Sequence, residues 1–375
     1  MSGIYIHIPF CRKACHYCNF HFSTQIEHID SFVNALLSEI EIQKNYIAGP
    51  IETLYFGGGT PSLLSSEHLD KIIAKVSDHF SFAPNIEFTL EANPDDIDFE
   101  KTKSWKSKGI NRLSIGIQSF QDEALTWMNR AHTTKQSYAA IENAKAAGIH
   151  NISTDLIYGT PHLSDQALIK DIEILNNYDI PHISCYALTV EEKTALHSLI
   201  QKKKIENVDT EKQARHFEIV VDQLGHFGFE HYEISNFAKP GHRSKHNSNY
   251  WKGIPYLGLG PSAHSFNIVS RQWNVANNHL YIQSISQKKV PFEIENLAIA
   301  TRYNEYMMIS LRLIEGFELN EIQERFGAAY VEHTQQILNA LIAEGKIIQS
   351  ENRYTIALNA RFLADGIASD FFIID

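Results

Sequence analysis

Several protein classes are excluded by what the sequence lacks. Only four of its 375 residues are cysteine, too few for a disulfide-stapled scaffold, and 43% hydrophobic residues are too many for a disordered chain. No stretch approaches about 20 apolar residues, and the opening MSGIYIHIPF lacks a basic segment and a cleavage site, so we expect a cytoplasmic protein. Basic residues are scarce as well. The 33 Lys and Arg against 44 Asp and Glu give a net charge of −11, which argues against nucleic-acid binding outside residues 202–204.

Short β-branched runs alternate with amphipathic stretches over roughly the first 230 residues. We expect strands at residues 4–8, 52–56, 85–90, 112–117, 151–157 and 182–188. We expect helices at residues 29–46, 66–80, 138–147, 166–176 and 211–227. Units of this kind predict βαβ crossovers around a parallel sheet, and therefore an α/β fold in the form of a partial barrel.

The composition changes after the last of these helices. Residues 233–278 are rich in Gly, Asn, His and aromatic residues and show little periodicity, so we expect ordered loops and short strands. Three helices at 301–313, 319–326 and 331–344 and two strands at 346–349 and 354–356 then predict a small winged-helix-like module. The acidic chain favours a lid or partner-docking role for this module over DNA binding. We expect three parts, at residues 1–232, 233–295 and 296–375.

Three cysteines, Cys11, Cys15 and Cys18, lie within eight residues directly after the first predicted strand. Loops at the carboxyl ends of strands carry the active sites of barrel enzymes, and a cysteine cluster in a reducing compartment indicates metal ligation or redox chemistry. Three thiolates can hold three irons of a [4Fe–4S] cluster and leave the fourth iron open. The alternative is a structural zinc site with His16 or His21 as the fourth ligand.

Polar residues and glycines recur where the other strands end. The run Gly57–Pro61 follows the second strand, and its missing side chains allow close backbone approach to a bound amino acid or nucleotide. The third and fourth strands end in Glu91 and Gln118, and the fifth strand carries Asp155 shortly before Tyr158 and Gly159. Each could singly be a turn or cap residue, but that explanation does not account for their shared position beside the cysteines. We interpret Cys185, at the sixth strand, as a core thiol.

These motifs together resemble the radical S-adenosylmethionine (SAM) superfamily, whose hallmark is the Cys-x3-Cys-x2-Cys loop. Within it, the chain is similar to the oxygen-independent coproporphyrinogen III oxidase branch through Tyr5-Ile-His-Ile-Pro-Phe-Cys11, Gly57-Gly-Gly-Thr-Pro-Ser62, Glu91-Ala-Asn-Pro94, Ser114-Ile-Gly-Ile-Gln-Ser-Phe120 and Asp155-Leu-Ile-Tyr-Gly159. The resemblance implies a [4Fe–4S] cluster on the three cysteines, with SAM on its open iron. It also implies cofactor contacts from Tyr5, Tyr17, Gly58, Gly59, Thr60, Glu91, Gln118, Arg130, Asp155 and Ala187.

Two departures from the oxidase pattern change the expected function. The oxidases carry a further cysteine where this chain has Phe20, and they have an N-terminal extension that we do not expect here. The run His246-Asn-Ser-Asn-Tyr250-Trp251 instead resembles the His-Asn-x-x-Tyr-Trp signature of the related heme chaperones. A heme site needs an axial donor and an apolar surface, for which His246, His264, Tyr250 and Trp251 are the candidates.

The resemblance therefore implies a heme chaperone that binds heme and transfers it to acceptor hemoproteins, supported by the cluster and SAM. Such a protein could associate peripherally with respiratory membranes, and we expect it to lack coproporphyrinogen oxidase activity. One alternative is the oxidase itself, which decarboxylates propionates to vinyl groups by radical chemistry. Another is a zinc-bound winged-helix regulator.

Overall fold

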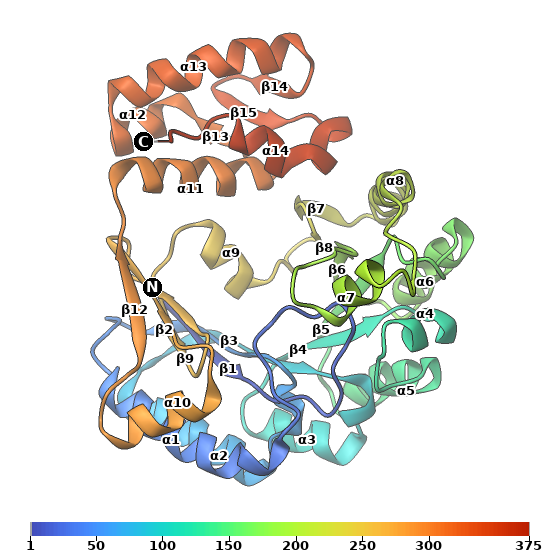
Figure 1. The fold of residues 1–375 in the computed structure, drawn as a ribbon, viewed down its shortest axis with the longest axis vertical. Coiled ribbons are helices and arrows are strands. Elements are labelled where there is room, and N and C mark those ends of the chain that lie inside the picture. Colours follow the sequence, from blue (N-terminus) through green and yellow to red (C-terminus); the bar gives the residue numbers. More distant parts are fainter. Residues whose placement is uncertain (1, 375) are drawn as a thin grey trace.

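The computed structural model describes residues 2–374 and is built around one twelve-stranded sheet. Six neighbouring strands in this sheet are parallel and follow one another in chain order (Figure 1). They are β1 (Ser2–Ile8), β2 (Ile51–Gly58), β3 (Phe82–Ala92), β4 (Arg112–Gln118), β5 (Asn151–Tyr158) and β6 (His182–Ala187). The expected partial barrel of six βα units is confirmed.

Helices follow each of these strands and cover the sheet. They are α1 (Ile29–Ile42), α2 (Ser66–His79), α3 (Phe99–Ser107), α4 (Asp122–Trp127), α5 (Thr134–Ala146), α6 (Asp165–Asn177), α7 (Ala195–Gln201) and α8 (Thr210–His226). Side-chain caps set several starts, as at Ser65, whose hydroxyl accepts from the amide of His68. The central strands are buried along nearly their whole length, which explains their continuous apolar runs.

Later segments extend the sheet at both edges. Beyond β6 lie β8 (Asn236–Ala238) and β7 (Glu230–Glu233). Beyond β1 lie β9 (Tyr256–Leu259), β10 (His264–Phe266), β11 (Ser270–Asn274) and β12 (Phe292–Asn296), with α10 (Asn278–Ser286) before the last. Of these four, β9 runs parallel to β1 and the rest are antiparallel to their neighbours.

The expectation of only loops and short strands in residues 233–278 is wrong at one place, because α9 (Lys245–Trp251) forms there. Ser244 caps this helix, and the Glu87 carboxylate accepts the amides of Lys245 (3.0 Å) and His246 (2.9 Å). A seven-residue helix is too short to show periodicity. A glutamate from β3 thus completes an N-terminus that the local pattern could not reveal.

The chain ends in a separate hydrophobic cluster. This cluster is built on α11 (Ile299–Arg312), α12 (Leu319–Phe326) and α13 (Ala328–Ala343), with β13 (Phe317–Glu318), β14 (Ile347–Ser350), β15 (Arg353–Ile356) and α14 (Ala364–Ser369). The strand order β13-β15-β14 with this helix order confirms the winged-helix-like module. Figure 1 shows it across from the barrel, with α11 nearest to α9. Across residues 2–374, no helix combines the length and hydropathy needed to cross a bilayer.

Candidate functional site: two adjoining cavities

The three clustered cysteines lie on an irregular loop that follows β1, residues 9–25, here called the cysteine loop. Its base is closed by two backbone hydrogen bonds. The Cys11 amide donates to the Ser23 carbonyl (3.0 Å), and the Ser23 amide donates to the Pro9 carbonyl (2.9 Å). These bonds hold the thiols at the carboxyl end of the parallel strands, where the sequence predicted them.

The turn after α4 supports the far side of the cysteine loop. The side-chain amide of Asn129 donates through Nδ2 to the Ala14 carbonyl (2.7 Å), and Nδ1 of His16 pairs with the Trp127 carbonyl (2.8 Å). The His16 amide also donates to the Met128 carbonyl (3.1 Å). The His16 ring is not among the residues that line the cavity beside the thiols, which disfavours it as the fourth ligand of a zinc site.

The glycine run after β2 packs against the cysteine loop as well as lining the space beside it. The amides of Gly59 and Thr60 donate to the carbonyls of Ile8 (2.8 Å) and Phe10 (2.7 Å). A side chain at Gly59 would bring its Cβ within 2.6 Å of the Phe10 carbonyl oxygen. The glycines are therefore needed for close contact with the loop, and these amides are not free for a ligand.

A cavity of about 580 Å³ opens beside the thiols, and we call it the cysteine cavity. It collects the predicted cluster and SAM residues Cys11, Cys15, Tyr17, Cys18, Gly58, Gly59, Thr60, Glu91, Gln118, Arg130, Asp155 and Ala187. Of the predicted set, Tyr5 alone lies outside it. Strand ends far apart in sequence thus meet at one edge of the sheet, as parallel topology requires. The α11 residue Arg312 also lines this cavity.

Arg130 supplies a half-buried positive charge to the cysteine cavity. Its guanidinium donates to Asn93 Oδ1 (2.9 Å) and the Gly116 carbonyl (2.8 Å), and it lies 3.4 Å from both Cys15 Sγ and the Tyr17 hydroxyl. Burial alone would lower the pKa of Arg130, but the charges of Tyr17 and Cys15 raise it. The cation therefore persists beside the thiols and favours their charged form.

Two carboxyl groups face the same space. Burial raises the pKa of Glu91 to about 7, against a hydrogen bond from the Tyr55 hydroxyl (2.7 Å), and nearby Asp155 raises it further. Burial raises the pKa of Asp155 to about 6. The Gly58 amide also donates to Glu91 (3.2 Å). Two carboxylates whose charge is made costly by burial are suited to a cationic ligand, which would favour their ionised form.

The thiols themselves are partly desolvated. Burial raises the pKa of Cys11 to about 11, although a hydrogen bond from Thr60 (3.5 Å) opposes the shift. Burial also raises the pKa of Cys18, and Cys15 adds to the rise in both. Thiols that disfavour one another's charge fit a shared cationic centre, which would stabilise all three thiolates. Among residues 2–374, no three His, Cys, Asp or Glu side chains already surround a single-ion position.

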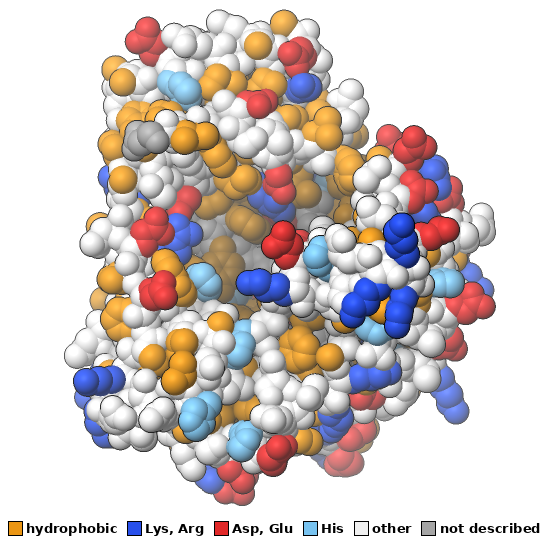
Figure 2. All heavy atoms as spheres, viewed as in Figure 1, with side chains coloured by type: hydrophobic (Ala, Val, Ile, Leu, Met, Phe, Trp, Pro, Cys, Tyr) orange, Lys and Arg blue, Asp and Glu red, His pale blue; other side chains and the backbone are white. Residues whose placement is uncertain are grey.

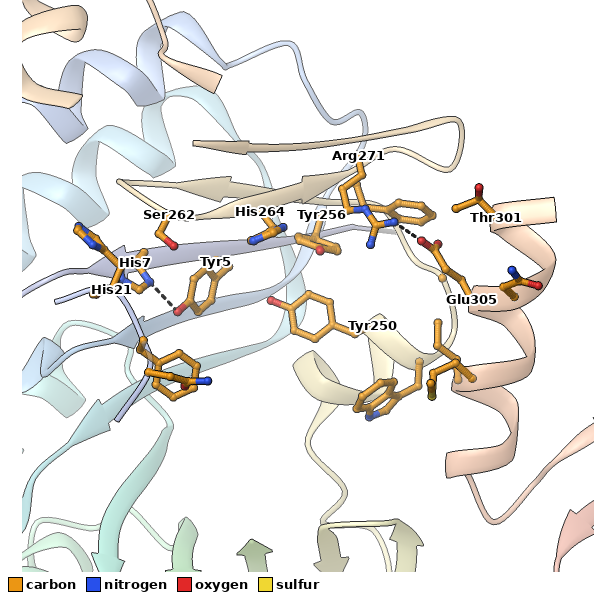
Figure 3. A pocket seen from close by; sticks show the side chains of 18 of the residues that line it. Tyr5, His7, His21, Tyr250, Tyr256, Ser262, His264, Arg271, Thr301 and Glu305 are labelled. Carbon is orange, nitrogen blue, oxygen red and sulfur yellow. Dashed lines mark hydrogen bonds and ion pairs between the residues drawn. The ribbon is translucent and has the colours of Figure 1, made fainter. Parts of the chain in front are cut away.

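A second cavity, of about 840 Å³, lies between the sheet and α11 (Figures 2 and 3). We call it the aromatic cavity. Its rings come from β1, the cysteine loop, α9, β9, β10 and the C-terminal segment and belong to Tyr5, Phe20, Tyr250, Trp251, Tyr256, Phe266 and Phe372. His7, His21 and His264 also line it, and Arg271 pairs with Glu305 of α11 at its side. A large, mostly apolar space with a few polar groups suits a flat organic ligand.

His246, the histidine of the His-Asn-x-x-Tyr-Trp run, does not line either cavity. It is 2% exposed, and its two ring nitrogens pair with Thr53 Oγ1 and the Tyr250 hydroxyl, each at 2.8 Å. The ring stacks on Tyr55 with centroids 4.7 Å apart. Burial lowers the pKa of His246 to about 3. In this structure His246 fixes α9 to the sheet, and neither nitrogen is free for iron.

His264 is the predicted heme candidate that does face the aromatic cavity. Its side chain is exposed, and its ring stacks on Trp273 with centroids 6.0 Å apart. Partial burial and the charge of Arg271 lower the pKa of His264, so the ring is neutral near pH 7, as a metal ligand must be. Tyr250 and Trp251 also line this cavity. His21, the other possible zinc ligand, lies here with its Nε2 paired to Asn278 (2.7 Å).

The structure adds residues to the site that the sequence did not single out. In the cysteine cavity these are Asn93 and Gly116, and a Cβ at Gly116 would lie 3.0 Å from Arg130. In the aromatic cavity they include Met308 on α11 and His7 on β1. Tyr5 and His7 are two residues apart and therefore share one face of β1, a period-2 signal that could have grouped them.

Comparisons with known proteins agree with this geometry. Residues 5–175 match the Radical SAM superfamily, and residues 299–363 match the HemN C-terminal domain. The Bacillus subtilis protein named heme chaperone HemW is 34% identical, over 99% of this chain and 99% of its own length. Its namesake from Mycobacterium tuberculosis is 34% identical over 97% of this chain and 93% of its own length.

One solved structure is similar along nearly the whole chain. It is coproporphyrinogen III oxidase (HemN) from Escherichia coli, a radical SAM enzyme, with a TM-score of 0.86 over 99% of this chain and 89% of its own. Its sequence identity is 20%, so the likeness establishes the shared fold.

Proposed function

The chain belongs to the HemW family of radical SAM proteins, and on that premise we propose that it binds heme in the aromatic cavity and passes it to acceptor hemoproteins. Its relatives are named heme chaperones. The observation that carries the proposal is an aromatic-lined cavity of about 840 Å³ with an exposed, neutral histidine, directly beside the cysteine cavity. Apolar rings and an axial donor are what a heme site requires.

Membership of the radical SAM superfamily implies a [4Fe–4S] cluster and SAM. We assign the cluster to Cys11, Cys15 and Cys18, because their mutually disfavoured charges and the adjacent Arg130 fit a cationic centre. When bound, a cluster of this kind supplies an electron for reductive cleavage of SAM. Zinc is less well supported, since His16 does not line the cysteine cavity and His21 lines the aromatic cavity instead.

For SAM, the chain offers a charge pattern that matches the cofactor. Glu91 and Asp155 are half-buried carboxyl groups suited to ammonium, sulfonium or ribose hydroxyl groups, and Arg130 can pair with a carboxylate. Gln118 and Ala187 line the same wall. We infer that these residues orient SAM, while the glycine run acts mainly by holding the cysteine loop in place.

For heme, we assign the axial position to His264. It is exposed within the aromatic cavity, whereas both nitrogens of His246 are committed to Thr53 and Tyr250. Tyr250 and Trp251 offer ring surface to the macrocycle, and the motif histidine acts by positioning them.

Anaerobic titration with hemin tests the assignment. We expect a Soret shift in the wild type, at least tenfold weaker binding with an altered Soret band in His264→Ala, and wild-type behaviour in His242→Ala, whose exposed histidine lines neither cavity. A wild type without a stable Soret shift would overturn heme binding. An unchanged spectrum and affinity in His264→Ala would overturn the ligand assignment alone.

The shared fold with HemN makes coproporphyrinogen III oxidation the second candidate. We favour transfer because Phe20 stands where the oxidases have a further cysteine. Heme-loaded protein should pass heme to a heme-free acceptor faster than heme dissociates into buffer. Stoichiometric protoporphyrinogen formation from coproporphyrinogen III with dithionite and SAM would instead establish the oxidase.

A further inference from the structure

The cysteine cavity and the aromatic cavity share part of one wall. Asn19 and Phe20, directly after Cys18 on the cysteine loop, line both of them. The Phe20 side chain is 66% exposed, which places a large apolar ring where it has little protein to cover it. A planar macrocycle in the aromatic cavity would meet this ring together with those of Tyr250 and Trp251.

The wall is also thin beside Phe20. His7 lines the aromatic cavity, whereas Gly58 lines the cysteine cavity, and a Cβ on Gly58 would lie 2.6 Å from the His7 ring. The same ring pairs through Nε2 with the His21 carbonyl of the cysteine loop (2.9 Å). One layer of residues therefore separates the two spaces, so displacement on one side is transmitted to the other.

Phe20 is tied to a cluster ligand as well as to the aromatic cavity. Its backbone amide faces the Cys18 sulfur. Hydrogen bonds to ligand sulfurs and solvent exposure are two of the factors that set the potential of an iron–sulfur cluster. A porphyrin that displaced the Phe20 ring would change the solvent exposure of the cluster and the hydrogen bonding at Cys18.

We propose that Phe20 couples the two cavities, so that a porphyrin bound in the aromatic cavity shifts the potential of the cluster on Cys11, Cys15 and Cys18. This inference rests on the proposed function. By linkage, the oxidation state of the cluster changes porphyrin affinity by the same free energy. Redox state would thereby set when the cargo is held and when it is released.

The test uses zinc protoporphyrin IX, which fills the site without iron redox chemistry. Its affinity for the cluster-loaded full chain is measured with the cluster oxidised and dithionite-reduced, and the cluster potential is titrated with and without it. We expect at least a threefold difference in affinity, equivalent to about 28 mV for one electron. Phe20→Ala should keep its iron and sulfide and lose this difference. Phe372→Ala, which removes a ring from the aromatic cavity alone, should bind more weakly and keep it.

The outcomes separate the coupling from the proposed function. Saturable porphyrin binding with equal affinities in both redox states would overturn the coupling and leave heme binding standing. A full difference in Phe20→Ala would overturn the role of Phe20. Failure of the wild type to bind either hemin or zinc protoporphyrin would overturn heme binding and the coupling together.

Discussion

The two cavities use the same sheet but are constructed differently. The cysteine cavity is formed where consecutive parallel strands end, so its residues recur once per βα unit from Cys11 to Ala187. The aromatic cavity instead uses one face of β1 together with β9, β10, α9 and α11, segments that lie more than 200 residues further along the chain. The cysteine cavity is therefore formed by the barrel itself, whereas the aromatic cavity depends on segments that follow the barrel in the chain.

Their electrostatics differ in the same way. The cysteine cavity gathers half-buried ionisable groups, including Arg130, Glu91 and Asp155, each with a shifted pKa. The aromatic cavity presents rings, and burial lowers the pKa of His7 to about 4 and also lowers that of His264, leaving both neutral. The cysteine cavity is therefore suited to a charged cofactor, and the aromatic cavity is suited to a flat apolar ligand.

Removal of one cluster thiol should have the largest effect, and it should affect the cysteine cavity but not the aromatic cavity. Cys15→Ala should abolish iron and sulfide incorporation, because the cluster loses one of three proposed ligands. Porphyrin binding should persist, since Cys15 does not line the aromatic cavity. Cys185→Ala is the matched control, because that thiol is buried outside the cysteine cavity. Iron content and a Soret titration check both sites, and wild-type iron content in Cys15→Ala would contradict the assignment.

A second variant pair separates structure from ligation in the aromatic cavity. His246→Ala should lower the free energy of unfolding by about 3 kcal/mol, because it leaves buried Thr53 and Tyr250 groups without partners and opens a void. His264→Ala should change it by less than about 0.5 kcal/mol, since that side chain is exposed. Urea denaturation under anaerobic conditions measures both, and equal losses would contradict the division of roles.

These roles mark where sequence reasoning succeeded and where it could not. Strand-end residues such as Glu91 and Asp155 were predictable, because parallel strands bring their carboxyl ends to one edge whatever the loops do. The role of His246 was not, because it depends on Thr53 and on the capping of α9 by Glu87, residues nearly 160 or more positions away. A motif shows that a histidine matters but not which neighbour occupies its nitrogens.

The position of Tyr5 likewise could not be predicted from its motif alone. The resemblance implied a place for it beside the cluster, and its ring does stack on Tyr55, which donates to Glu91. Its own side chain lines the aromatic cavity and pairs with His7 (3.2 Å). The aromatic cavity borders the Tyr5 side of β1 and is completed by β9, which pairs with β1. No local sequence pattern specifies that β9 pairs with β1.

The pH dependence of binding should distinguish the two cavities by about tenfold. Because their pKa values are raised in the folded protein, Glu91 and Asp155 contribute fully to the stability of the ligand-free fold below about pH 4, where both are protonated. This contribution is lost as the pH rises through 6 and 7. A cationic ligand needs them ionised, so SAM affinity should rise about tenfold from pH 6 to pH 8. Calorimetry on cluster-loaded protein measures it, and Glu91→Gln should flatten the profile. Zinc protoporphyrin affinity should change little, and a parallel rise would contradict the assignment.

The smallest effect concerns preorganisation of the cysteine loop. Asn129 adopts a left-handed conformation (φ 59°) and donates to the Ala14 carbonyl, so Asn129→Gly should remove one hydrogen bond without backbone strain. We expect a loss of about 1 kcal/mol and a several-fold faster release of iron to a chelator. Asn129→Ala should lose more, because alanine disfavours that backbone conformation. Lys13→Ala, which removes an exposed contact from the cysteine loop to the same turn, should have a smaller effect, and a wild-type release rate in Asn129→Gly would show that the turn does not preorganise the thiols.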